Sequence, residues 1–266
     1  MRKNTNELFF QLVALMLAII VVHAVYVTAV RPNADRIVNR AAEVAAAGGA
    51  YEVPRTFFVV IKDFEQEACF ILMIWALAIM GYKTRIAMRE SRMLEMPLVS
   101  LSEGTRILPG DAGQLLRPLQ SLPERQQGYV LPRALSTALL RFQVTSSVEA
   151  ATEAAHSVCE AESSRLDSEL SMVRYITWAI PSIGFIGTVR GIGSALGRAH
   201  EAMAGDIAGV TASLGVAFNS TFVALLISMV VMFFMHQLQL MQERLVLDAY
   251  AYSENRMLRF LKSQSA

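Results

Sequence analysis

Cysteine, histidine and charged side chains are scarce in this sequence. It contains two cysteines and four histidines, and 18% of its 266 residues are Asp, Glu, Lys or Arg. Two cysteines cannot build a disulfide framework, and no cysteine or histidine has the spacing of a metal-binding motif. The sequence therefore predicts neither a metal site nor a bound cofactor.

Enzyme motifs are also missing. The sequence has no phosphate-binding loop, no Gly-x-Ser-x-Gly turn and no set of Ser, His and Asp that a membrane topology could assemble. Gly184, Gly187, Gly191 and Gly193 superficially resemble a nucleotide-binding loop, but they lie within an apolar helix. We expect no catalytic residues, and the protein is not predicted to be an enzyme.

The chain has little net charge and many apolar residues. Its net charge is +1, and it has no basic segment interleaved with aromatic residues, so nucleic acid is not an expected partner. Apolar residues make up 54% of the sequence. This composition is typical of a polytopic membrane protein, for which the lipid bilayer is a partner.

Three apolar segments are long enough to cross a bilayer, which takes about 20 residues, and a shorter one is just enough if its flanks lie at the interface. Four basic residues directly follow the second segment and place the next loop, and hence both termini, in the cytoplasm. The predicted fold is all-α, with four transmembrane helices, the last two extended into long cytoplasmic helices. The predicted parts are the N-terminal segment and first span (1–30), an extracytoplasmic loop (31–67), the second span (68–82), a cytoplasmic linker and helical stalk (83–172), the third span (173–197), a short extracytoplasmic turn (198–209), the fourth span (210–235) and a cytoplasmic C-terminal helix (236–266).

The third and fourth spans each carry small and hydroxyl residues at helical spacing. Residues three and four apart share a helix face, so each span presents a narrow seam that allows close approach of another helix. The seam residues are Gly184, Gly187, Thr188, Gly191 and Ala195 on the third span, and Ser213, Ala217, Ser220, Thr221, Ala224 and Ser228 on the fourth.

Two of these hydroxyls are predicted to lie at the same depth. Thr188 is about 22 Å from the cytoplasmic start of the third span, and Thr221 about 21 Å from the cytoplasmic end of the fourth, at 1.5 Å per residue. A hydroxyl both donates and accepts hydrogen bonds, so a ring of such pairs is suited to carry a proton or a small cation. The alternative is that each threonine only bonds the carbonyl four residues before it.

These residues carry a resemblance to a known family. The segments Gly184-Phe-Ile-Gly187-Thr188-Val-Arg-Gly191-Ile and Ala217-Phe-Asn-Ser-Thr221-Phe-Val-Ala-Leu resemble the signature of the MotA/TolQ/ExbB proton-channel family. The resemblance covers roughly residues 166–250. The residue order of the motif is more similar to the ExbB/TolQ branch. The four spans, with a cytoplasmic segment between the second and third, resemble the flagellar-stator branch.

The resemblance implies a function and a partner. It implies a bacterial inner-membrane subunit that forms a homo-oligomeric ring, expected to be a pentamer, around a dimer of a single-span protein similar to ExbD, TolR or MotB. The partner would supply a membrane Asp, and the ring would supply the hydroxyls of Thr188 and Thr221. The ion pathway is accordingly predicted to contain Thr188, Thr221, Ser220 and Asn219.

Other residues of the two spans are assigned to packing and gating. Pro181 removes one backbone hydrogen bond and is predicted to mark a bending point one turn before Gly184. The predicted packing positions are Pro181, Gly184, Gly187, Gly191, Ala217 and Ala224. Arg190 departs from the family pattern and is a gating candidate, with Asn219 at a similar level as its candidate hydrogen-bond partner.

Two other functions remain open. A non-conducting membrane scaffold would use the small-residue seams only for assembly. A self-sufficient carrier is disfavoured because the sequence indicates no Asp or Glu within a span. The charged residues just before the second span, Lys62, Asp63, Glu65 and Glu67, are interpreted as a solvated shoulder, and His23 as a neutral residue bonded to a neighbour near the outer interface.

Overall fold

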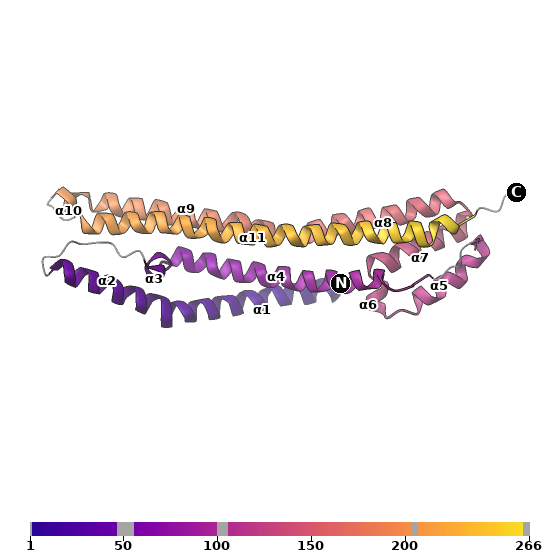
Figure 1. The fold of residues 1–266 in the computed structure, drawn as a ribbon, viewed down its shortest axis with the longest axis horizontal. Helices are drawn as coiled ribbons and strands as arrows, with labels where there is room; N and C mark the ends of the chain where they lie inside the picture. The colour runs from indigo at the N-terminus through magenta and orange to yellow at the C-terminus, as the bar shows by residue number, and fades with distance from the viewer. Residues whose placement is uncertain (1, 47–55, 100–105, 204–206, 263–266) are drawn as a thin grey trace. The chain divides into compact units, whose positions relative to one another are not determined.

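The computed structural model of the chain describes residues 2–46, 56–99, 106–203 and 207–262. Over these ranges the structure is helical apart from turns and one isolated β-bridge between Ile107 and Leu261. The elements labelled in Figure 1, with their short connecting turns, are α1 (Arg2–Val25), η1 (Tyr26–Val30), α2 (Arg31–Ala46), α3 (Phe57–Val60), α4 (Phe64–Leu94), η2 (Pro109–Asp111), α5 (Ala112–Gln120), α6 (Glu124–Gln127), α7 (Val130–Thr145), α8 (Val148–Glu169), α9 (Ser171–Gly197), α10 (Ala199–Met203), α11 (Ala208–Arg256) and η3 (Leu258–Phe260).

Four helical segments are long and apolar enough to cross a membrane. They are Glu7–Ala41, Phe64–Leu94, Val148–Gly197 and Ala208–Phe260. The predicted all-α fold with four transmembrane helices is therefore confirmed, and the chain is a multi-pass membrane protein.

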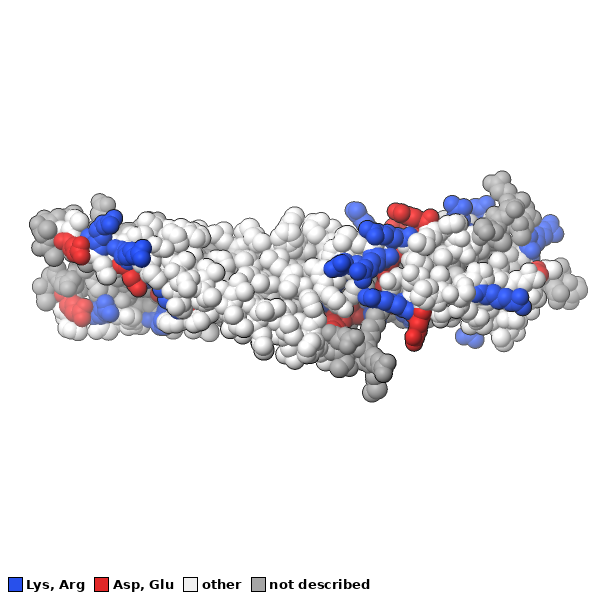
Figure 2. Space-filling view, turned by 90° about the horizontal axis from the view of Figure 1, so that it is seen from below, with Lys and Arg blue, Asp and Glu red and all other residues white. Residues whose placement is uncertain are grey.

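The chain folds into two compact units. The first contains residues 1–80 and 172–235, and the second contains residues 81–171 and 236–266. The first unit exposes many large apolar side chains, among them Met16, Ile20, Phe185 and Phe222. One face of it shows a broad zone without charged side chains among the described residues (Figure 2). Such a surface is unusual for a soluble protein and is expected to contact lipid.

The first span continues as a helix beyond its predicted end. α1 passes through the π-helical turn η1 into α2, which begins at Arg31 and carries Pro32 in its first turn. Proline has no backbone N–H and cannot bond the carbonyl four residues before it. A π-helical turn at this position changes the hydrogen-bond spacing, so the helix continues past the proline.

The helix that contains the second span is longer than the predicted span, and the fourth span continues as a long helix, as predicted. α4 begins at Phe64, so Glu65 and Glu67 lie in its first turn, whereas Lys62 and Asp63 precede it. α11 is a single helix of 49 residues that includes most of the predicted C-terminal helix. The short helix α10 lies in the predicted outer turn, of which residues 204–206 lie outside the described part.

The predicted cytoplasmic stalk contains a break that the sequence analysis did not foresee. Ser146 adopts a positive φ of 54°, which ends α7, and the Ser147 hydroxyl accepts a hydrogen bond from the Ala150 N–H at 3.2 Å. Serine is a favoured N-cap residue because its side chain satisfies a free N–H of the first helical turn. The Ser-Ser pair therefore separates α7 from α8, which pack against each other in the second unit.

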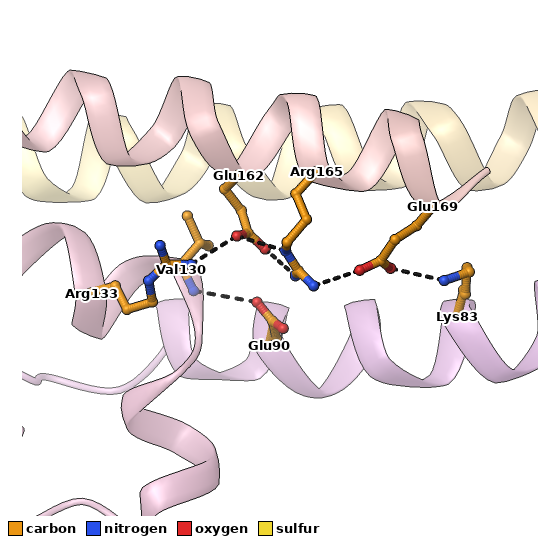
Figure 3. Close-up of polar contacts among 7 residues, drawn as sticks. All are labelled: Lys83, Glu90, Val130, Arg133, Glu162, Arg165 and Glu169. Carbon is orange, nitrogen blue, oxygen red and sulfur yellow. Dashed lines mark hydrogen bonds and ion pairs between the residues drawn. The ribbon is translucent and has the colours of Figure 1, made fainter. Parts of the chain in front are cut away.

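The second unit combines an apolar core with a polar network. The core centres on α7, where Leu131, Leu135, Leu139 and Phe142 are fully buried. Beside it, ion pairs connect α4, α7 and α8 (Figure 3). Arg133 contacts Glu162 at 3.0 Å, Arg165 contacts both Glu162 and Glu169, and Lys83 contacts Glu169 at 2.8 Å. Glu90 accepts from the Val130 N–H at 3.4 Å.

Glu162 provides a test of this network. Its side chain is only 2% exposed and binds two arginines. Replacing Glu162 with alanine should destabilise the folded chain by about 1–3 kcal/mol because it leaves partly buried cations without an acceptor. Thermal unfolding of the detergent-purified chain measures this loss. Glu160→Ala is the matched control, since Glu160 lies on the same helix with its side chain 70% exposed. Equal effects of the two changes would contradict the structural role of the network.

Candidate ion-conduction site

α9 and α11 approach each other closely along the predicted glycine positions. A Cβ atom added to Gly184 would lie 2.4 Å from the Cβ atom of Ala224, and one added to Gly187 would lie 2.5 Å from that of Ser220. One added to Gly191 would lie 2.6 Å from the Ala217 backbone nitrogen. These distances are below van der Waals contact. Gly184, Gly187 and Gly191 therefore lie against Ala224, Ser220 and Ala217 at the interface between the two helices.

Thr188 and Thr221 meet at this interface. Their Oγ1 atoms share a hydrogen bond, so the predicted pairing of the two hydroxyls at one level is confirmed. Thr188 also lies within donating distance of the Ala217 carbonyl (3.0 Å) and the Gly184 carbonyl (3.3 Å), and Thr221 donates toward Gly184 at 3.2 Å. Thr188 therefore also makes the alternative contact, a hydrogen bond to the carbonyl of Gly184, four residues earlier in its own helix.

This arrangement offers more acceptors than protons. Each hydroxyl has one proton, and the two protons are shared among two carbonyl oxygens and the two hydroxyl oxygens themselves. Rotation of the hydroxyls exchanges donor and acceptor without moving the helix backbones. A hydroxyl pair of this kind can present either oxygen lone pairs or a proton to a third group. It is therefore suited to guide a proton or to coordinate a small cation.

Further hydroxyls line the same helix pair on both sides of the threonines. The Oγ atoms of Ser194 and Ser213 lie 3.2 Å apart, and the Ser228 hydroxyl donates to the Thr177 carbonyl at 3.1 Å. Residues 177 and 194 are about 25 Å apart along a helix at 1.5 Å per residue. Polar groups are thus distributed over most of the membrane-spanning length of α9.

The contact at Thr177 also explains how α9 accommodates Pro181. Proline has no N–H, so it cannot bond the carbonyl four residues earlier, which belongs to Thr177. The Ser228 hydroxyl from α11 supplies a donor to that carbonyl. Membrane helices tolerate proline when a neighbouring group satisfies the freed carbonyl, and Ser228 has this role here. α9 accordingly continues as a helix through Pro181.

Ser220 connects the helix pair to α4. It is fully buried, and its hydroxyl lies 3.4 Å from the side-chain nitrogen of Gln66, which also donates to the Val60 carbonyl at 3.2 Å. Gln66 is itself fully buried. Asn219, the remaining predicted pathway residue, is partly buried and makes no side-chain hydrogen bond within the described part of the chain. The structure therefore groups Thr188, Thr221 and Ser220 and leaves Asn219 apart.

The predicted pairing of Arg190 with Asn219 is wrong. The Arg190 guanidinium instead forms an ion pair with Glu65 in the first turn of α4, at 2.7 Å. A carboxylate attracts a guanidinium far more strongly than an amide does, and α4 packs close enough to α9 to provide one. The Glu65 Cγ atom lies 3.1 Å from the position that a Cβ atom on Gly187 would occupy. Gly187 directly precedes Thr188 in the sequence.

A second carboxylate on α4 binds the first span. Glu67, with 7% of its side chain exposed, contacts His23 Nδ1 at 2.7 Å and also the Arg31 guanidinium. The interpretation of His23 as a residue bonded to a neighbour is confirmed, but the interpretation of Glu65 and Glu67 as a solvated shoulder is wrong. The reason is that α1, α4 and α9 pack together here and exclude water from both carboxylates.

These contacts correct the argument against carboxylates within the spans. Glu65 and Gln66 lie level with Gly187 and Ser220, and therefore with the threonine pair. Gly187 is about 20 Å along α9 from Arg174, at 1.5 Å per residue. Depth measured along each span separately had placed these carboxylates outside the spans. The overlooked signal was a row of polar residues directly before an apolar run, with His23 and Arg190 as available partners in other spans.

The Glu65–Arg190 pair can be tested by exchanging its charges. Arg190→Glu should destabilise the chain by about 1–2 kcal/mol, since a like-charged pair replaces an ion pair that is half exposed on the arginine side. Adding Glu65→Arg should restore most of the loss. Thermal unfolding of the single and double variants checks this expectation. A double variant no more stable than the worse single one would show that the pair does not join α4 to α9.

Comparison with known proteins gives a family but no individual relative. No curated protein and no solved structure matches the chain. A model of the MotA/TolQ/ExbB proton channel family matches residues 125–250, which include the threonine pair and most of α11. This family consists of membrane channels and energy transducers rather than known enzymes. This match assigns residues 125–250 to the MotA/TolQ/ExbB proton channel family, which indicates an ion-driven membrane channel or energy transducer.

Proposed function

We propose that the chain is a ring-forming subunit of a bacterial inner-membrane motor that uses a proton or sodium gradient to move a single-span partner. The hydroxyl pair of Thr188 and Thr221 is the observation that carries this proposal, because it lies within the segment that matches the family. The pair can guide an ion but has no group that binds and releases a proton near neutral pH. A carboxylate must therefore act beside it.

The partner is the proposed source of that carboxylate. The carboxylates of the chain nearest to the hydroxyls are already engaged, Glu65 by Arg190 and Glu67 by His23 and Arg31. Both carboxylates therefore already have cationic partners within the chain. A second protein, similar to ExbD, TolR or MotB and carrying a membrane Asp, would supply an unpaired acid, and the family assembles with single-span partners.

The energetics favour coupling to movement. One charge that crosses a membrane potential of 100 mV releases about 2.3 kcal/mol. A few ions would then suffice to rotate or pull a partner helix within a homo-oligomeric ring, for which we propose five copies. Both termini are proposed to lie in the cytoplasm, in agreement with the basic residues that follow the second span.

Purification from the native membrane tests the proposal. The full chain, extracted in mild detergent, should appear in native mass spectrometry as a homo-oligomer with fewer copies of a short protein that has one membrane helix and an Asp near its start. Vesicles containing this complex should release protons or sodium when a potential is imposed. A monomer without such a partner, or vesicles without ion flux, would contradict the proposal.

The alternative is a membrane scaffold that conducts no ions. The close contacts at Gly184, Gly187 and Gly191 would serve assembly equally well in either function. The two threonine hydroxyls separate the functions, because a scaffold would need them only as hydrogen bonds between α9 and α11 and not for ion flux. Substitutions at the threonines and at the glycines therefore distinguish the two.

A further inference from the structure

Beyond the threonine pair, the first unit contains a cavity with several charged residues in its lining. It has a volume of about 480 Å³ and lies beside the last turns of α9 and the first turns of α11. Ligand pockets in proteins usually measure about 300–1,000 Å³, so this cavity is large enough for a small ligand or headgroup. Its charged lining residues are Lys62, Asp63, Arg190 and Arg198, and we refer to it as the outer pocket.

Cations predominate in the outer pocket. Lys62 and Arg198 form no ion pair within the described ranges, and Arg190 uses one nitrogen for Glu65. A guanidinium has five N–H donors in a planar fork that fits phosphate and carboxylate oxygens. The hydroxyl groups of Ser194 and Ser213 also line the wall, but they bond each other, and Ser213 donates to the Gly209 carbonyl. Three positive side chains facing one cavity favour an anion with several oxygen atoms.

Asp63 adds a negative group to this otherwise basic lining. Its Oδ2 atom is buried and has no hydrogen-bond partner among the described residues. Burial raises the pKa of the Asp63 carboxyl above its ordinary value, while Lys62 and Arg190 act in the opposite direction. Asp63 lines the pocket, so its carboxylate can accept a hydrogen bond from a cationic group of a ligand there. An ammonium group provides such a donor.

The position of the pocket agrees with a ligand from the membrane. Arg190 lies about 24 Å along α9 from Arg174, at 1.5 Å per residue. The hydrocarbon core of a bilayer is about 30 Å thick, so a long cationic side chain at this level reaches the headgroup region of the outer leaflet. Apolar side chains of Val38, Val59 and Val216 complete the lining beside the charged groups.

We propose that the outer pocket binds a phosphate group linked to a primary ammonium, with the phosphate held by Lys62, Arg190 and Arg198 and the ammonium by Asp63. A phosphatidylethanolamine headgroup has this chemistry, and so does free phosphoethanolamine. The proposal does not depend on ion conduction, because Lys62, Asp63 and Arg198 are not part of the proposed ion pathway. It assigns to α3 and the outer turns of α9 and α11 a role in lipid recognition.

Binding to the detergent-purified full chain tests the proposal. The probes are short-chain phosphatidylethanolamine, short-chain phosphatidylglycerol and O-phosphoethanolamine, with affinity measured by native mass spectrometry and by the ligand-induced shift in melting temperature. The unmodified chain should prefer phosphatidylethanolamine to phosphatidylglycerol. The double variant Lys62→Gln/Arg198→Gln should bind both lipids at least tenfold more weakly, and Asp63→Asn should remove the preference while retaining phosphatidylglycerol binding.

Arg89→Gln is the matched control. Arg89 is an exposed cation on α4 outside the pocket, and its replacement should leave binding unchanged. Binding of O-phosphoethanolamine as tight as that of the lipid would support the same chemistry with a soluble ligand, whereas binding of the lipid alone identifies the membrane as the source. Unchanged affinity in the double variant, equal loss in Arg89→Gln, or an unchanged lipid preference in Asp63→Asn would overturn the proposal.

Discussion

Replacement of Thr188 or Thr221 by valine is expected to abolish ion-driven output while the oligomer remains assembled. Valine keeps the shape of threonine but removes the hydroxyl, so the remaining threonine loses its partner in the hydrogen-bonded pair. The hydroxyls bond the carbonyls of Gly184 and Ala217, but the close approach of α9 and α11 at Gly184 and Gly191 rests on backbone and Cβ atoms that valine leaves in place, so assembly should persist. Ion flux in vesicles, measured with native mass spectrometry of the same sample, checks both parts of the expectation.

Thr211→Val is the matched control for this experiment. Thr211 also lies on α11, but its hydroxyl donates only to the Ile207 carbonyl of its own helix, at 2.9 Å. Loss of that local bond should not reduce ion flux. If Thr188→Val and Thr221→Val leave motive-force-dependent output intact, the hydroxyl pathway is wrong and the scaffold function is favoured.

Substitution of alanine for Gly184 or Gly191 is expected to separate α9 from α11. A Cβ atom at Gly184 would lie 2.4 Å from the Ala224 side chain, and one at Gly191 would lie 2.6 Å from a backbone atom of α11. Overpacking of a close interface typically costs about 1–3 kcal/mol, and here the backbone of one helix must move. Thermal unfolding of each variant in detergent should show a clear loss of stability.

Gly193→Ala separates this effect from the general consequence of removing a glycine. No atom lies within 4 Å of a Cβ atom added at Gly193, although it is two residues from Gly191 on the same helix. Alanine is also the better helix former, so Gly193→Ala should be neutral or stabilising. A similar loss of stability in Gly191→Ala and Gly193→Ala would disprove the role of close packing at the seam.

The site consists of two parts that differ in how well the sequence predicted them. The hydroxyl pair and the glycine contacts were predicted because α9 and α11 are joined by a short connection and run in opposite directions. The short connection limits how far one helix can be shifted along the other, and helical periodicity defines which residues of each helix face the other. The family resemblance covered the same two helices.

The ion pairs of Glu65 and Glu67, which lie at the same depth as the threonine pair, were not predicted. Glu65 and Arg190 are separated by 125 positions in the chain, and Glu67 and His23 by 44. Helical periodicity says nothing about which spans are neighbours or how far one is shifted along another. The pairing of Arg190 with Asn219 was inferred only from their similar depth in the membrane. The actual partner, Glu65, lies on α4, and the sequence does not indicate that α4 packs against α9.

The sequence by itself determined the class of the protein, because the number and length of apolar segments are local properties. It also determined the small-residue seam, because periodicity along one helix defines its faces. Only the tertiary structure decided that Ser228 satisfies the carbonyl freed by Pro181, that Glu65 and Glu67 are paired, and that four charged residues surround the outer pocket. The physical reason is that a buried charge is stable only beside its partner, and that partner comes from a helix distant in the chain.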